Sequence, residues 1–144
     1  MPESCELRTG AGSVWVDLRE PGGEVVIRIL VGALFVGHGL VHGIMFALPY
    51  SAQAAADLPF NPSRSWLIGE TRAFGFVFAL VVTLGFIVAG AGYLWRASWW
   101  PHLTIVAAFL SLVLLVLYFS KWWIAGYAIS VALAIFAWRT LVRT

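Results

Sequence analysis

The sequence predicts an all-α integral membrane protein whose four helices form an antiparallel, up-down bundle. Apolar residues make up 61% of the 144 residues and charged residues only 11%, whereas soluble proteins contain about 45–50% and about 25%. The apolar residues gather in four continuous stretches, each close to the ~20 residues that a helix needs to cross a bilayer. The stretches lack the alternation of apolar and polar residues that a membrane β-barrel requires, so helices are the spanning structure that remains.

We expect the spans at residues 25–48, 72–95, 101–119 and 122–139, within a membrane domain covering residues 25–144. Pro101 suits the first turn of the third helix, where its missing N–H leaves no hydrogen bond unmade. Only Ser120 and Lys121 separate the last two spans, so these helices must be antiparallel neighbours. Residues 1–24 mix charged residues with glycines and are expected to form a flexible cytoplasmic tail.

The distribution of positive charge predicts the orientation. Six arginines fall on the side of the tail, the second loop and the C-terminus, and three Lys or Arg residues fall on the other side: Arg8, Arg19, Arg28, Arg96, Arg139 and Arg143 against Arg64, Arg72 and Lys121. The positive-inside rule then places both termini in the cytoplasm of a multi-pass protein of the cell (inner) membrane. The net charge of +2 is too small to indicate nucleic-acid binding.

Ala52-Gln53-Ala54 has the small-x-small form of a signal-peptidase site. The apolar run before it, residues 29–46, is longer than the about 7–15 residues of a signal-peptide core. We therefore expect the first span to be retained.

His38 and His42 lie one helical turn apart on one face of the first span. A zinc site needs three or four ligands, and no Asp, Glu or Cys lies inside a span to supply them. The remaining histidine, His102, is expected to differ from His42 in depth by roughly 20 Å. Two histidines on one helix face also cannot bind opposite sides of one haem iron. The sequence therefore predicts no metal site, no catalytic group and no cofactor, with a quinone or a haem left open as alternatives.

Polar side chains occur near the middle of the other spans, at about the depth of His38. They are Thr83, Ser111 and Ser130, which with His38 and His42 form a candidate intramembrane polar cluster. The alternative is that each hydroxyl bonds the carbonyl four residues earlier in its own helix. The sequence does not decide whether the histidines face the bundle interior or the lipid.

Small residues in the first two spans predict close helix packing, because glycines let helices approach closely in lipid. The candidate packing residues are Gly32, Gly37, Gly39 and Gly43 in the first span and Gly85, Gly90 and Gly92 in the second. We expect the glycine face of the second span to lie against the first.

The stretch Arg28-Ile-Leu-Val-Gly-Ala-Leu-Phe-Val-Gly-His-Gly-Leu-Val-His-Gly, followed by three more spans, resembles small four-helix bacterial membrane proteins of the broad DoxX-like type. It resembles more closely a group of uncharacterised four-span proteins with a His-Gly-Leu-x-His stretch in the first helix. The resemblance covers residues 25–141. Some DoxX-type proteins are membrane subunits linked to quinone-dependent oxidation of sulfur compounds, which implies a quinone or partner-subunit role. It transfers no catalytic residue to this chain.

We therefore expect a protein of the lipid bilayer that acts by assembly, as an accessory subunit of a membrane complex or as a homo-oligomer. The alternative is a redox or quinone-associated subunit that uses His38 and His42, because histidine can bond a quinone carbonyl and carry a proton. A proton-coupled transporter is disfavoured, because such carriers place a carboxylate inside the membrane.

Overall fold

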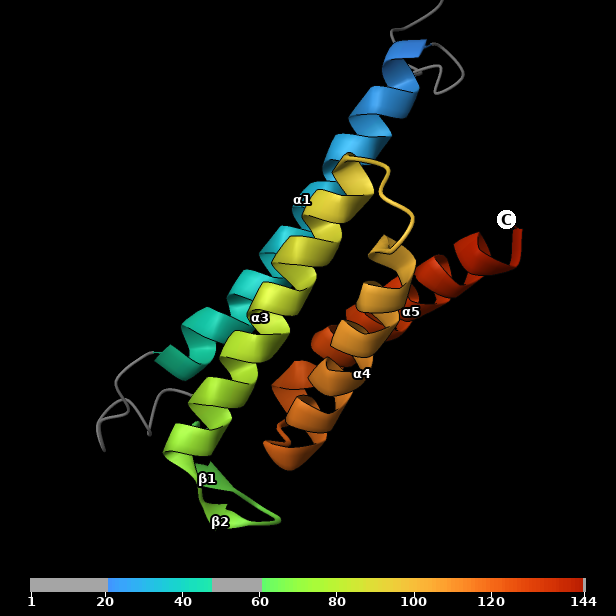
Figure 1. The fold of residues 1–144 in the computed structure, drawn as a ribbon. Coiled ribbons are helices and arrows are strands. Elements are labelled where there is room, and N and C mark those ends of the chain that lie inside the picture. The colour runs from blue at the N-terminus through green and yellow to red at the C-terminus, as the bar shows by residue number, and fades with distance from the viewer. Residues whose placement is uncertain (1–20, 48–60, 144) are drawn as a thin grey trace, which may run out of the picture.

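The computed structural model describes residues 21–47 and 61–143. Within these ranges the chain forms four long helices, α1 (Pro21–Ala47), α3 (Arg72–Leu94), α4 (Trp100–Leu117) and α5 (Ile124–Arg143). Two short strands, β1 (Arg64–Ser65) and β2 (Gly69–Glu70), precede α3, and a 3-10 turn, Lys121–Trp123, precedes α5 (Figure 1). Each of the four helices is long and apolar enough to cross a membrane. The all-α, four-span architecture predicted from the sequence is confirmed.

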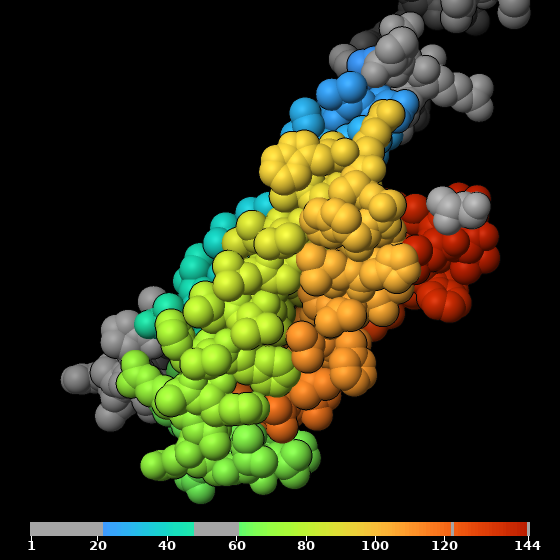
Figure 2. Space-filling model, in the orientation of Figure 1, coloured from blue at the N-terminus to red at the C-terminus, as the bar shows by residue number. Residues whose placement is uncertain are grey.

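The helices pack in chain order: α1 against α3, α3 against α4, and α4 against α5. Figure 1 shows α1 and α3 lying side by side along their length, whereas α5 crosses behind α4 and its C-terminal end diverges from α1. Figure 2 shows one face of the bundle, on which α3 and α4 lie directly against each other. The largest apolar side chains of the core, including Phe35, Phe86 and Leu114, are completely buried.

Several helix ends differ from those expected, most of all the start of α1 and the end of α5, which extends to Arg143 instead of residue 139. Helix α1 begins at Pro21, so Gly22 and Gly23 belong to the helix. Proline is preorganised for a first helical turn, and the acidic Glu24 in that turn interacts favourably with the helix dipole. Helix α5 begins at Ile124, because the 3-10 turn occupies the preceding residues. Residues 1–20 of the expected tail and the Ala52–Ala54 segment lie outside the described residues.

The two strands form a small antiparallel hairpin that closes one end of the bundle, with Ser65 paired to Gly69. The Ser65 hydroxyl donates to the carbonyl of Leu117 at 2.6 Å, and the Trp66 indole N–H donates to the carbonyl of Val116 at 2.5 Å. These carbonyls belong to the last turn of α4, where no partner is available within the helix. The hairpin side chains therefore cap the C-terminus of α4.

Candidate functional site

Two histidines of α1 and two serines, one each from α4 and α5, form a continuous chain of hydrogen bonds inside the bundle. Nε2 of His42 lies 2.9 Å from the Ser111 hydroxyl, which lies 2.9 Å from the Ser130 hydroxyl. The Ser130 hydroxyl in turn lies 3.0 Å from Nε2 of His38. All four residues are buried. We call these four residues the His–Ser chain.

Thr83, the fifth residue of the expected cluster, lies apart from the His–Ser chain. Its hydroxyl contacts two carbonyl oxygens at 2.8 Å, that of Gly39 across the α1–α3 interface and that of Ala79 in its own helix. Thr83 thus joins α1 to α3, whereas the His–Ser chain joins α1 to α4 and α5.

The two imidazole rings also line a partly open groove between α1 and α5. The groove has a volume of about 440 Å³. Apart from the histidines its lining is almost entirely apolar, and it consists of Ala33, Leu34, Gly37, His38, Val41, His42, Trp123, Ala125, Gly126 and Ile129. The indole of Trp123 lies nearly parallel to the His42 ring, at a centroid distance of 6.5 Å and an angle of 12°. We call this feature the α1/α5 groove.

Nδ1 of His42 is a polar atom in this region that has no hydrogen-bond partner among the described residues. The atom is buried. A buried polar atom without a partner is destabilising by about 1–3 kcal/mol. An unpaired nitrogen beside an apolar groove is a feature that a bound ligand could satisfy.

The glycines divide between helix packing and the groove. A Cβ atom at Gly39 would lie 2.9 Å from Cβ of Phe86, and one at Gly90 would lie 2.8 Å from Cβ of Phe35, so both close the α1–α3 interface. The same interface includes Gly32, next to Leu94, and Gly43, next to Thr83.

Three of the predicted glycines lie elsewhere. Gly85 faces Ala107 of α4, and Gly92 faces Trp99 and Trp100, so the glycine face of the second span is shared between α1 and α4. Gly37 lines the α1/α5 groove, and no atom of the described residues lies within 4 Å of a Cβ position there. At 100° per residue Gly37 lies about 200° around the helix from Gly39, which turns it away from α3.

Within the described residues no group of three or more His, Cys, Asp or Glu side chains is placed to hold a metal ion. His102 is exposed in the first turn of α4. The two buried histidines use Nε2 to bond serines, so each ring has only Nδ1 left for another partner.

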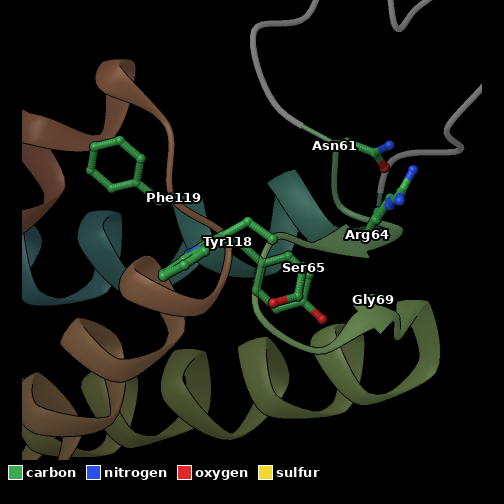
Figure 3. A pocket seen from close by; sticks show the side chains of 7 residues that line it. Asn61, Arg64, Ser65, Gly69, Tyr118 and Phe119 are labelled. Atoms are coloured by element: carbon green, nitrogen blue, oxygen red, sulfur yellow. The ribbon is translucent and has the colours of Figure 1, made fainter.

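A second cavity, of about 450 Å³, lies between the hairpin and the end of α4. Figure 3 shows Ser65 beside Tyr118, with Asn61 and Arg64 across the cavity from Phe119. The Ser65 hydroxyl is bonded to Leu117, and the Tyr118 hydroxyl is bonded to Thr71. Because these polar groups hold the hairpin on α4, the cavity is best explained as part of that structural contact.

The groove itself has no signal in the sequence. Trp123 fits an aromatic residue at the membrane interface, and Gly126 and Ile129 are ordinary residues of an apolar helix. Their contribution depends on the angle at which α5 crosses α1.

Comparison with known protein families, curated proteins and solved structures finds no match for this chain. The resemblance of the first span to DoxX-type proteins stays a prediction that these comparisons do not support.

Proposed function

We propose that this four-span membrane protein binds a lipophilic ligand with a quinone-type headgroup in the α1/α5 groove and acts as a ligand-binding subunit of a membrane redox complex. One observation carries the proposal. The apolar groove between α1 and α5 is lined by His38 and His42, and the buried Nδ1 of His42 has no hydrogen-bond partner among the described residues. Small-molecule sites are mostly apolar pockets that contain a few well-placed polar groups.

The chemistry of the groove suits such a ligand. The apolar lining accommodates a ring and its alkyl tail, and a ring N–H of a histidine can donate to a carbonyl oxygen. Residues along the groove, such as Leu34 and Val41, have exposed side chains, so a ligand dissolved in the bilayer has an apolar route of entry. The volume of about 440 Å³ lies within the range of about 300–1,000 Å³ that is typical of ligand pockets.

The assembly role predicted from the sequence is supported by a separate observation, the exposure of α5. Only Ser130, Leu133 and Ala137 of this helix are buried, and large apolar side chains such as Ile135 are exposed. We propose that this face meets lipid or a neighbouring chain. Sedimentation of the protein in detergent tests the homo-oligomer: a mass of one chain, corrected for bound detergent, excludes it.

Ligand binding is tested with decylubiquinone added to the protein in lipid nanodiscs. Quinones quench tryptophan emission, and Trp123 lies in the groove, so we expect saturable quenching. The variant Gly37→Leu extends a side chain into the groove, and the first atom of that side chain has room because no described residue has an atom within 4 Å of a Cβ there. It should abolish the saturable component.

The matched control is Ala128→Leu, which places the same leucine side chain at an exposed position of α5 outside the groove. This variant should bind like the unaltered protein. Equal quenching of the unaltered protein and Gly37→Leu would show that the quinone does not occupy the groove.

A further inference from the structure

We infer that the α1/α5 groove prefers a lipophilic hydroxyl compound, of the phenol or quinol type, to the corresponding carbonyl compound. This inference rests on the proposed function, because it specifies which ligand chemistry the same groove favours. It follows from the number of hydrogen atoms available to the His–Ser chain.

The His–Ser chain contains three successive hydrogen bonds, and each needs one hydrogen atom. The hydroxyls of Ser111 and Ser130 supply one hydrogen each. The third must come from Nε2 of one histidine, since a neutral imidazole carries a hydrogen on only one of its two nitrogens. Neutral rings are expected here because a charged side chain is costly inside a bilayer.

The other arrangements each leave the chain incomplete. If neither Nε2 atom carried a hydrogen, one of the three contacts would have no donor. If both carried one, a buried hydroxyl would have no acceptor in the chain. Thr83 and Thr104 donate to the carbonyl four residues earlier, but Ser111 and Ser130 use their hydroxyls between the histidines.

One imidazole therefore donates through Nε2 and the other accepts. Consequently one Nδ1 atom is unprotonated and can only accept a hydrogen bond, whereas the other carries a hydrogen and can donate one. This result is the same whichever histidine is the donor, so it does not depend on assigning tautomers. The centroids of the two rings are 5.0 Å apart and both histidines line the groove, so we place one ligand oxygen between the two Nδ1 atoms.

A ligand hydroxyl matches this pair, because it donates to the bare Nδ1 and accepts from the protonated one. A carbonyl or ether oxygen only accepts, so it leaves one imidazole nitrogen unpaired. Losing a hydrogen bond and leaving its buried partner unsatisfied weakens binding by about tenfold. Of a quinone and its quinol, the groove should therefore bind the quinol more tightly.

The test uses two redox-inert probes, 4-decylphenol and 4-decylanisole, with the protein in nanodiscs and with empty nanodiscs to correct for partitioning. We expect the phenol to bind about tenfold more tightly than the anisole. In a variant with both His38→Phe and His42→Phe, which keeps rings in the groove but removes the nitrogens, the preference should disappear.

The outcomes separate this inference from the proposed function. If the two probes bind the unaltered protein with equal affinity, the preference is overturned. If Gly37→Leu then abolishes the binding of both probes, the groove is still a ligand site. Partitioning without saturation, unchanged by Gly37→Leu, would show that the groove holds lipid acyl chains only, and both proposals would fail.

Nitrogen NMR of the histidine rings tests the inference without a variant or a ligand. We expect the Nε2 protonation of the two buried histidines to sum to one hydrogen, whether each ring is fixed or the chain reverses quickly. Two rings in the same tautomer, giving a sum of zero or two, would overturn it.

Discussion

The hydroxyl oxygens of Ser111 and Ser130 lie 2.9 Å apart across the interface of α4 and α5, and each hydroxyl also contacts a histidine of α1. Helices α1 and α5 occupy the two ends of the packing order. The bond between His38 and Ser130 therefore ties together two helices that otherwise contact each other little. The same chain of bonds positions the imidazoles beside the groove.

Because Ser111 is central to this chain, its replacement should weaken the protein in a way that depends on His42. Ser111→Ala leaves Nε2 of His42 without its partner, so it should lower the free energy of unfolding. Buried hydrogen bonds inside membranes contribute about 0.6 kcal/mol on average and up to about 1.7 kcal/mol. A double-mutant cycle with His42→Phe, measured by unfolding in mixed micelles, should show a coupling energy in this range.

The control for this cycle is Thr104→Val, which removes a buried hydroxyl of α4 that bonds the carbonyl of Trp100 in its own helix. Its coupling to His42→Phe should be close to zero. A coupling as large as that of Ser111 would show that the measured effect is a general response of α4.

The two neighbouring glycines Gly37 and Gly39 should respond oppositely to the same substitution. Gly39→Ala places a Cβ 2.9 Å from Phe86 and 3.0 Å from the Thr83 carbonyl oxygen, and overpacking of this kind costs about 1–3 kcal/mol. Gly37→Ala meets no atom of the described residues within 4 Å and replaces glycine with a better helix former, so stability should be unchanged or slightly higher. Thermal unfolding in detergent measures both, and equal losses would contradict the packing described for α1.

The spans could be predicted because lipid leaves a long apolar segment few options other than a helix. The depth of the polar residues could be predicted too, since depth follows from position along a span. Position along the chain places His38, Ser111 and Ser130 each near the middle of its own span, and hydrogen bonds join these three side chains.

The direction in which each residue faces could not be predicted, because it depends on helix rotation and crossing angle. Depth along its span groups Thr83 with the serines, yet Thr83 lies on the α1–α3 interface with Gly39. Residue type groups Gly37 with the packing glycines, yet Gly37 lines the groove. In nearly uniform apolar helices the sequence pattern carries little information on which side faces a neighbour.

The hairpin depends on contacts between distant parts of the chain, so local sequence patterns do not predict it. The Ser65 hydroxyl donates to Leu117 and accepts from the backbone N–H groups of Leu67 and Ile68. Ser65→Ala should therefore loosen the hairpin while leaving the helices intact. We expect faster amide hydrogen exchange in residues 64–71 and an unchanged unfolding midpoint.

The control for the hairpin is Ser63→Ala, because Ser63 contributes only backbone groups to the hydrogen bonds described here. Its exchange rates should match those of the unaltered protein. Faster exchange throughout α3 and α4 in Ser65→Ala would instead show that the hairpin is required for the stability of the whole bundle.

At the opposite end of the bundle, Arg96 adopts a left-handed backbone conformation, with φ of 58°, just after α3. The amide of Ala97 donates to the carbonyl of Gly92 and that of Arg96 to the carbonyl of Tyr93, the pattern that ends many helices and that favours glycine at this position.

The Arg96 side chain forms an exposed ion pair with Glu24 at 3.2 Å, and such pairs contribute at most about 1 kcal/mol. Arg96→Ala and Arg96→Gly both remove the ion pair, but only glycine relieves the backbone strain. We expect the glycine variant to be more stable than the alanine variant by about 1 kcal/mol, measured by unfolding in mixed micelles. An alanine variant as stable as the glycine variant would show that the left-handed conformation is not retained once the arginine is removed.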